Sequence, residues 1–326
     1  MPDILIDIQK LNKEYTLAGG MFNSKNRIIH AVNDVDLQIL KGETLGLVGE
    51  SGCGKSTMAR LITRLEKPSS GFISFRGENI NSYDKESLKA YRRNVQLIFQ
   101  DPYSSLNPRK SAVSIIMEPL IIHRNGDKDK RRESVLELMA KVGLSDEQAN
   151  RYPHEFSGGQ RQRIGIARAL ILKPQLIIAD EPVSALDVSI QAQILNLLKD
   201  LKQDFGLTYL VISHDLNVIR HMADRIAVMY LGKIVEQAEN NDIYSNPLHP
   251  YTQLLLSAVP ACNPQQKRKK VIIKGEARIE GERGCNFQNR CIYKLPVCKE
   301  QQPVLKETGN KRFCACHLAP SIKMQG

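Results

Sequence analysis

The residues best suited to chemistry form one glycine-rich stretch, Gly49-Glu50-Ser51-Gly52-Cys53-Gly54-Lys55-Ser56-Thr57. It contains the pattern G-x-x-x-x-G-K-[ST], in which backbone N–H groups and the positive end of the following helix solvate phosphate oxygens. Lys55 would add a fixed charge beside the β- and γ-phosphates, and the Ser56 hydroxyl would ligate Mg²⁺. The pattern therefore predicts that these nine residues bind a nucleoside triphosphate such as ATP.

Two acids, Asp180 and Glu181, follow the apolar run Leu176-Ile177-Ile178-Ala179. A carboxylate that ends a buried strand emerges at the carboxyl end of an open α/β sheet, where such sheets bind ligands. We expect Asp180 to hold Mg²⁺ through water, and Glu181 to polarise the attacking water. Taken alone, the two acids could be a solvated strand end, and the glycine-rich loop is what favours the catalytic interpretation.

These side chains need a sheet that brings their loops together. Residues 44–48 form a short apolar strand that runs into the glycine-rich loop, and residues 56–65 have the pattern of a helix. Further elements are expected as strands at 4–8, 31–39, 95–99, 176–179, 209–212 and 226–229, helices at 161–170 and 189–205, and a loop at 18–26. Strands that alternate with helices indicate a parallel-rich sheet covered on both faces.

Residues 111–150 change character, because helical spacing of apolar residues dominates there. The predicted fold class is therefore α/β, a P-loop NTPase core with a helical insertion subdomain and a small cysteine-rich C-terminal extension. We place the ATPase domain and the extension at residues 1–258 and 259–326. Within the ATPase domain, the core covers about 1–100 and 159–258, and the helical subdomain about 101–158.

Composition narrows the classes of protein that the chain can represent. The 326 residues carry a net charge of +11. The basic runs are short and lack interleaved aromatic residues. We therefore interpret the basic residues as lying on solvated helix faces and not on a surface that binds nucleic acid. No stretch approaches the ~20 apolar residues that span a bilayer. Acids near the start argue against a signal peptide. We expect a cytosolic protein, unless a partner holds it at a membrane.

Two more stretches complete a family pattern, Phe156-Ser157-Gly158-Gly159-Gln160 and Ser213-His214-Asp215. In this order and spacing the chain resembles the nucleotide-binding subunit of an ATP-binding cassette (ABC) transporter. The resemblance implies that Ser157, Gly158, Gly159 and Gln160 bind the γ-phosphate of ATP held by a partner subunit, in a head-to-tail dimer. It further implies that His214 contacts the γ-phosphate and assists catalysis together with Glu181 and Lys55.

The same resemblance assigns three other residues. Gln100 matches the loop that joins nucleotide state to the membrane subunits, and is expected to ligate Mg²⁺ with Ser56 and Asp180. Asp187 matches the loop that follows the two acids. Tyr15 matches the aromatic residue that stacks on adenine.

Residues 99–109, 180–189 and 246–252 resemble the peptide-transporter branch of this family, most closely the F-type ATPase of oligopeptide and dipeptide importers. Nickel, metallophore and sugar importers share these stretches, so nickel, a metallophore or another small solute is the alternative cargo. The branch implies a paralogous ATPase partner (with a homodimer as the alternative), two membrane permease subunits and an external solute-binding protein. It places the chain at the cytoplasmic face of the membrane, with no nucleic acid bound.

Five of the seven cysteines lie in residues 285–316. Cys285, Cys291, Cys298 and Cys316 have the spacing C-x₅-C-x₆-C-x₁₇-C, whereas paired zinc knuckles prefer C-x₂₋₄-C. Four thiolates suit an iron–sulfur cluster, and the resembled branch includes members with a [4Fe-4S] cluster there. Cys314 could replace Cys316, but the branch pattern ends in Cys-His. A zinc site or free thiols are the alternatives.

Two other function classes remain open from the sequence. One is an ABC ATPase that acts on nucleic acid or the ribosome, although such proteins usually carry two cassettes or a long coiled coil. The other is redox sensing through the cysteines, in which the ATPase rate would follow the oxidation state of a cluster.

Overall fold

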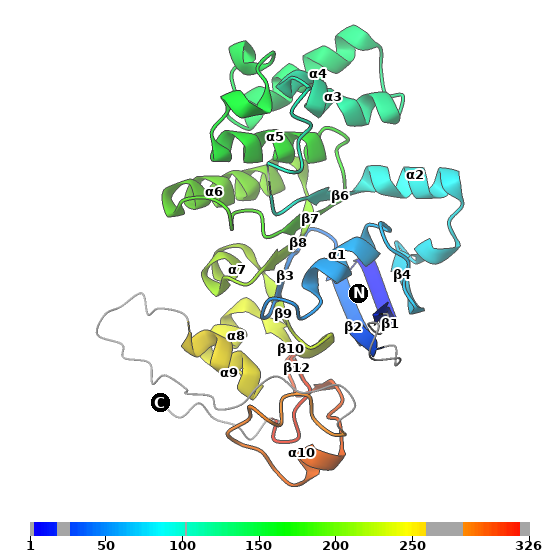
Figure 1. Cartoon of the computed structure of the whole chain (residues 1–326), viewed down its shortest axis with the longest axis vertical. Helices are drawn as coiled ribbons and strands as arrows, with labels where there is room; N and C mark the ends of the chain where they lie inside the picture. The colour runs from blue at the N-terminus through cyan, green and yellow to red at the C-terminus, as the bar shows by residue number, and fades with distance from the viewer. Residues whose placement is uncertain (1–2, 18–26, 102, 259–282, 320–326) are drawn as a thin grey trace, which may run out of the picture.

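Two sheets form the framework of the chain in a computed structural model that describes residues 3–17, 27–101, 103–258 and 283–319 (Figure 1). The loop expected at 18–26 lies outside these residues. The first sheet is antiparallel and has the order β2-β1-β4-β5, with β1 (Ile4–Leu17), β2 (Arg27–Leu40), β4 (Ser70–Phe75) and β5 (Glu78–Asn79). The strands expected at 4–8 and 31–39 are β1 and β2, which are longer than predicted.

The second sheet carries the loops that contain the motifs, and its strand order is β11-β12-β10-β9-β3-β8-β7-β6. Its strands are β3 (Thr44–Val48), β6 (Val95–Ile98), β7 (Leu176–Asp180), β8 (Thr208–Ser213), β9 (Arg225–Tyr230), β10 (Lys233–Glu239), β11 (Lys306–Glu307) and β12 (Phe313–Cys314). Strands β6, β7, β8, β3 and β9 pair in parallel, as expected. Strands β10, β12 and β11 pair antiparallel, so the sheet is mixed.

Alternate residues of the parallel strands point into two separate hydrophobic clusters. In β7, Leu176 and Ile178 belong to the cluster that includes β1, β2 and α1, whereas Ile177 belongs to the cluster of the remaining helices. The same alternation holds along β8. Because both faces are covered, these strands are apolar throughout, which is why they read as continuous runs in the sequence.

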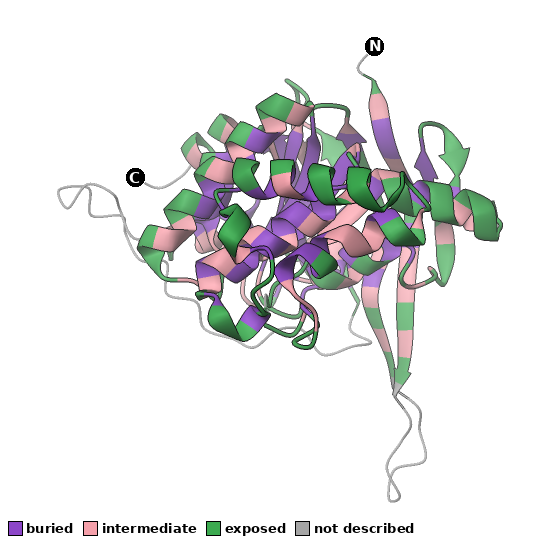
Figure 2. Ribbon diagram, turned by 90° about the horizontal axis from the view of Figure 1, so that it is seen from above, coloured by how far each residue is buried: buried purple, intermediate pink, exposed green. Residues whose placement is uncertain are grey.

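Helices pack against both faces of the second sheet, α1 and α2 in one hydrophobic cluster and the others in the second. Figure 2 shows that the outward surfaces of the helices in front are largely exposed. The helices that pack against the sheet are α1 (Lys55–Ile62), α2 (Lys85–Asn94), α3 (Ala112–Ile122), α4 (Lys128–Lys141), α5 (Gly158–Leu170), α6 (Val188–Phe205), α7 (Leu216–Met222), α8 (Asn240–Ser245) and α9 (Pro250–Ser257), with single 3₁₀ turns at Ile80–Ser82, Asp146–Gln148 and Pro153–Glu155. Asp84, Asp127 and Asp215 cap α2, α4 and α7 by accepting from backbone N–H groups of the first turn. Helix α1 ends at Ile62, three residues earlier than predicted.

Residues 283–319 form a small C-terminal segment with one short helix, α10 (Val297–Glu300). Strand β12 of this segment pairs with β10, and the Ala315 N–H donates to the Val235 carbonyl at 2.8 Å. The segment therefore continues the second sheet, at the foot of the molecule in Figure 1. The domain boundary at 258/259 adjoins residues outside the description and stays a prediction.

Candidate ATP site

The glycine-rich loop, hereafter the phosphate loop, joins β3 directly to α1. Gly54 has a φ of 112°, a conformation that L side chains rarely adopt, and an added Cβ would lie 2.1 Å from the Ala31 carbonyl oxygen. Only glycine fits at this point. The helix that follows starts at Lys55, so its free N–H groups open toward the loop.

Lys55 is buried within the phosphate loop. Its Nζ donates to the carbonyl oxygens of Gly49 at 2.7 Å and Glu50 at 3.0 Å, and its side chain is only 5% exposed. The Cys53 thiol lies 3.8 Å from the same Nζ, and burial raises the pKa of this thiol. The loop therefore curls around the ammonium group, with its backbone carbonyls turned to Lys55.

The two residues expected to flank Mg²⁺ are in contact. The Ser56 hydroxyl at the start of α1 donates to Oδ1 of Asp180 at 3.3 Å. Asp180 is the last residue of β7, and burial, more than any other cause, raises the pKa of its carboxyl. Parallel pairing of β7 with β8, and of β8 with β3, brings the ends of these strands to one side of the sheet. A hydroxyl and a carboxylate at this place are hard oxygen ligands that suit Mg²⁺.

The Glu181 carboxylate is held from two sides. Nε2 of Gln100 donates to Oε2 at 2.8 Å, and Nδ1 of His214 lies 2.9 Å from Oε1. Glu181 has a φ of 48°, a left-handed conformation uncommon for a residue other than glycine, and its N–H donates to the Ile212 carbonyl at 2.9 Å. Its side chain is 13% exposed, which leaves access for a water molecule. Three of the site residues predicted from the sequence thus meet here.

The signature stretch lies at the start of α5. Ser157 caps this helix: its hydroxyl accepts from the Gln160 N–H at 3.3 Å, and the Gln160 side chain accepts from the Ser157 N–H at 3.0 Å. An added Cβ on Gly159 would lie 2.6 Å from Ile190, and Leu186 lies next to Gly158. Among the described residues, no hydrogen bond or ion pair joins residues 157–160 to the phosphate loop. The structure thus leaves these two predicted ATP-binding elements apart within one chain.

Asp187 and Tyr15 also lie apart from the Glu181 cluster. Asp187 precedes α6 without a side-chain cap hydrogen bond. Tyr15 lies on β1, its hydroxyl donates to the Glu66 carboxylate, and the Lys13 Nζ is 5.0 Å from its ring centroid. Burial and Glu66 raise the pKa of Tyr15, while the Thr57 hydroxyl beside it acts in the opposite direction. Tyr15 is therefore close to the C-terminal end of the phosphate loop.

Two contacts to the phosphate loop come from residues that were not predicted from the sequence to be site residues. The Tyr251 hydroxyl of α9 accepts from the Glu50 N–H at 2.8 Å. Arg290 of the C-terminal segment forms a two-pronged ion pair with the Glu50 carboxylate, with both N–O distances at 2.8 Å. No local pattern predicts either contact, because both partners lie about two hundred or more residues further along the chain.

The four cysteines expected to bind a cluster line one small cavity. Cys285, Cys291, Cys298 and Cys316 all border it, whereas Cys314 does not. Burial, with smaller contributions from the three other thiols, raises the pKa of Cys291 to about 11. The cavity volume is about 10 Å³, roughly that of one water probe. Within the described ranges, no three Cys, His, Asp or Glu side chains are placed so that they could hold a metal ion.

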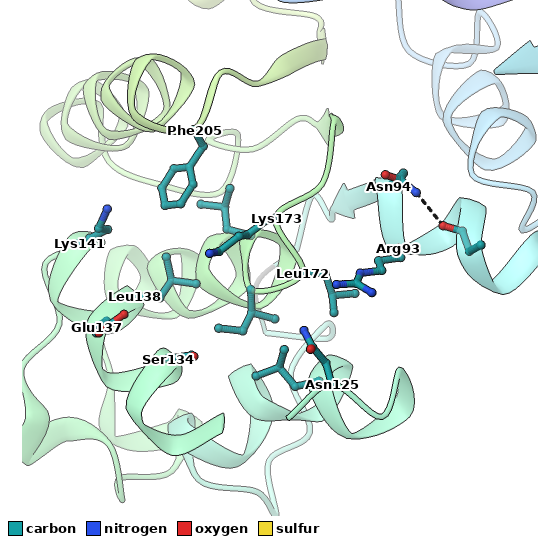
Figure 3. A pocket seen from close by; sticks show the side chains of 14 residues that line it. Arg93, Asn94, Asn125, Ser134, Glu137, Leu138, Lys141, Leu172, Lys173 and Phe205 are labelled. Carbon is teal, nitrogen blue, oxygen red and sulfur yellow. Dashed lines mark hydrogen bonds between the residues drawn. The ribbon is translucent and has the colours of Figure 1, made fainter. Parts of the chain in front are cut away.

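A much larger cavity, of about 750 Å³, lies between α2, α4 and the ends of α5 and α6 (Figure 3). Its basic side chains are Arg93, Lys141 and Lys173, and it includes Phe205 and Leu138 among its apolar ones. None of the site residues predicted from the sequence lines it. A search for the functional site by cavity size alone would therefore have missed the phosphate loop.

Comparison with known proteins agrees with this geometry. The ABC transporter family model matches residues 32–184, and the model of the oligopeptide/dipeptide transporter C-terminal region matches residues 235–298. The oligopeptide transport ATP-binding protein AppF of Bacillus subtilis (strain 168) is 52% identical over 321 residues, which cover 97% of this chain and 98% of that protein. The dipeptide transport ATP-binding protein DppF of Escherichia coli (strain K12) is 48% identical over 314 residues, or 96% and 93% of the two chains.

Solved structures give the same fold. The ATP-binding cassette MJ0796, in a dimeric post-hydrolysis state bound to ADP and Pi, matches with a TM-score of 0.64 and 34% identity over 72% of this chain and 99% of that one. CbiO1 from Clostridium perfringens, part of an ABC transporter complex, matches with a TM-score of 0.64 and 25% identity over 74% and 91%.

The chain belongs to the ATP-binding subunits of oligopeptide and dipeptide ABC transporters. The predicted family, the α/β cassette fold and the ATPase that couples hydrolysis to transport are confirmed. Among the described residues, none of the helices combines the length and the hydrophobicity of a transmembrane span.

Proposed function

We propose that the chain powers the uptake of oligopeptides or dipeptides from the cytoplasmic face of the membrane, without touching the cargo itself. The match of residues 235–298 to the oligopeptide/dipeptide C-terminal region supports this cargo. Two membrane permease subunits and an external binding protein would select the solute. Uptake of labelled peptide by membranes that carry the assembled transporter tests the cargo, and uptake of nickel or a metallophore in place of peptide would overturn it.

The observation that carries the proposed chemistry is the double support of Glu181 by Gln100 and His214. ATP would place its β- and γ-phosphates in the phosphate loop beside Lys55. Glu181 would accept a proton from water as the water oxygen bonds to the γ-phosphorus and the bond to the bridging oxygen breaks. Ser56, Asp180 and Gln100 would hold Mg²⁺, which neutralises charge on the β- and γ-phosphates when bound.

We place Ser157, Gly158, Gly159 and Gln160 against ATP held by a partner subunit. The 13-residue helix α5 begins there, so its positive end suits an anion, and Asp187 precedes α6 beside this element. A solved relative is a dimer bound to ADP and Pi, which supports the arrangement. The partner is a paralogous ATPase subunit, with a second copy of this chain as the alternative. Tyr15 would stack on the adenine, and membrane subunits would dock near Gln100 and the helical subdomain.

Trapping the dimer tests this proposal. The Glu181→Gln variant is mixed with its co-expressed paralogue, with ATP or without, and molar mass is measured by light scattering after gel filtration. We expect association that depends on ATP and is lost in Ser157→Arg, whose side chain would block the anion site. An ATP-loaded Glu181→Gln protein that stays monomeric with the paralogue and with itself would overturn the head-to-tail dimer.

We also propose that Cys285, Cys291, Cys298 and Cys316 hold a [4Fe-4S] cluster, with zinc as the alternative. Their convergence on one cavity supports a shared ligand. As these side chains lie, the cavity is too small for a cluster, so loading would require the segment to rearrange. Cluster binding would stabilise a segment that has little core of its own.

Elemental analysis and visible spectra of anaerobically purified protein test the cluster. Brown protein that contains iron is expected, with the colour lost in Cys291→Ser and kept in the matched control Cys314→Ser. Colourless protein that contains zinc would overturn the cluster in favour of the alternative. If instead the ATPase rate of wild-type protein follows the oxidation state of the cluster, its role is sensing rather than structural.

A further inference from the structure

We propose that Arg290 is a positioning residue of the ATP site, through which the C-terminal segment holds the phosphate loop in place. The inference rests on the ATPase activity of the family and not on the proposed cluster. Its basis is the two-pronged ion pair between the Arg290 guanidinium and the Glu50 carboxylate, with both N–O distances at 2.8 Å. Glu50 is the second residue of the phosphate loop.

Every polar group of Glu50 is fixed by a contact. The Tyr251 hydroxyl accepts from its N–H, the Lys55 Nζ and the Cys53 N–H donate to its carbonyl, and Arg290 holds its carboxylate. Three glycines in the loop give it many alternative conformations that binding would otherwise have to exclude. A loop that is already held in place avoids that loss of entropy, which strengthens binding.

Arg290 is itself well supported. Its side chain is 15% exposed, and the guanidinium carbon lies 5.8 Å from the Phe287 ring centroid and 5.9 Å from that of Tyr230. Phe287 packs on Tyr251, with ring centroids 5.6 Å apart. The same aromatic group thus supports both residues that reach Glu50. Planar geometry and two-point contact distinguish this arginine from a mobile surface charge.

The ion pair has an electrostatic consequence as well. The phosphate loop has to receive a polyanion, and Glu50 adds a carboxylate to that loop. Arg290 neutralises this charge, so the loop can keep an acid at this position without repelling the triphosphate. Removal of Arg290 therefore acts twice: it frees the loop and it exposes an uncompensated negative charge.

Attachment of the C-terminal segment to the core does not depend on Arg290, because other contacts also hold the segment in place. Arg312 donates to the Asn246 carbonyl and lies 3.8 Å from the buried Glu236 carboxylate. Strand β12 pairs with β10. Arg312 is a matched control for Arg290, since both arginines join the segment to the core but only Arg290 reaches the phosphate loop.

The test compares ATP dissociation constants of full-length variants by titration with a fluorescent ATP analogue, in parallel with their melting temperatures. Arg290→Ala is expected to weaken binding roughly 5-fold, since a well-formed pair that is partly exposed contributes of that order. Arg290→Lys should recover part of the loss, and Arg312→Ala should bind as wild type. Adding Glu50→Gln to Arg290→Ala should strengthen binding relative to Arg290→Ala alone, because the uncompensated charge is gone.

Two results would overturn the proposal. One is unchanged ATP affinity in a folded Arg290→Ala protein. The other is an equal loss in Arg290→Ala and Arg312→Ala that follows their melting temperatures, which would reduce Arg290 to a docking contact. Because the readout is binding to the isolated chain, a failure of the proposed dimer or cluster would not affect it.

Discussion

Nδ1 of His214 lies 2.9 Å from Oε1 of Glu181, across the ends of two neighbouring parallel strands. The register of β7 and β8 sets Asp180 opposite Ile212, so the next residues of each strand continue toward the same side of the sheet. A histidine from one strand can therefore orient an acid from the next, while Gln100 after β6 holds the other carboxylate oxygen. The contacts of Glu181 therefore form only when the loops after β6, β7 and β8 are all correctly positioned.

Glu181→Gln should retain ATP binding and lose at least ~10²-fold in turnover, because the amide keeps the shape of the acid but cannot accept the proton. Single-turnover hydrolysis of radiolabelled ATP and equilibrium binding measure the two effects separately. The exposed Glu133→Gln is the control and should hydrolyse ATP at the wild-type rate. Normal hydrolysis by Glu181→Gln would show that another group is the base.

His214→Ala should lower kcat by about 10-fold or more with little change in KM, because the imidazole acts on the catalytic acid and the γ-phosphate rather than on ground-state binding. Steady-state kinetics of phosphate release give both constants. The exposed His154→Ala provides the comparison. A rise in KM with an unaltered kcat would assign His214 to binding alone.

Lys55→Ala should weaken ATP binding by about 10- to 100-fold, the range expected when a buried charge-assisted contact is lost. Isothermal titration calorimetry measures the affinity. Lys41, whose exposed side chain pairs with Asp3 at 3.3 Å, offers the control Lys41→Ala. Equal affinities in the two variants would count against the phosphate loop as the triphosphate site.

Glu43→Gln should stabilise the protein relative to wild type increasingly as pH rises. Burial, above all other causes, raises the pKa of Glu43, although Arg225 lies 3.5 Å away and the Leu40 N–H donates to the carboxylate. A raised folded-state pKa gives stability that is complete below the unfolded value of about 4.5 and is lost as pH rises through the folded value. The amide introduced by Glu43→Gln cannot ionise, so the variant avoids that loss.

Melting temperatures of wild type and Glu43→Gln between pH 4 and pH 7.5 check this prediction. The difference should be smallest at the acid end and grow with pH. Glu133→Gln should show no such trend, since Glu133 is exposed. A constant difference across the range would mean that folding does not raise the pKa of Glu43.

The parts of the site that could be predicted from sequence are those fixed by short stretches of chain. A loop that wraps a phosphate needs glycine at Gly54 and a lysine directly after it, so the residue types alone identify it. The strands β7 and β8 are buried on both faces, so their apolar runs could be recognised in the sequence, and Asp180 and Glu181 stand at the end of β7. Roles that need a second subunit, such as that of Ser157, follow from family resemblance and stay proposals.

The parts that could not be predicted depend on distant pairings. Glu50 and Arg290 are 240 residues apart, and nothing near either residue indicates the other. The antiparallel strands β11 and β12 have two residues each, too short for any alternation of polar and apolar residues to be recognised. One local feature was also missed: helix α1 ends early because Arg64 adopts a left-handed conformation with a φ of 54°, which apolar spacing does not report.

Strand β12 also limits aggregation, because it covers the edge of β10. Phe313 and Cys314 occupy the outer side of β10 at Gln237 and Glu236, where bare peptide groups would otherwise be free to recruit strands from other molecules. Chains cut off after α9 would expose that side, so they are expected to aggregate even with every ATP-binding residue intact. The C-terminal segment is therefore expected to keep the protein soluble, and shortened variants made for crystallisation or engineering should retain it.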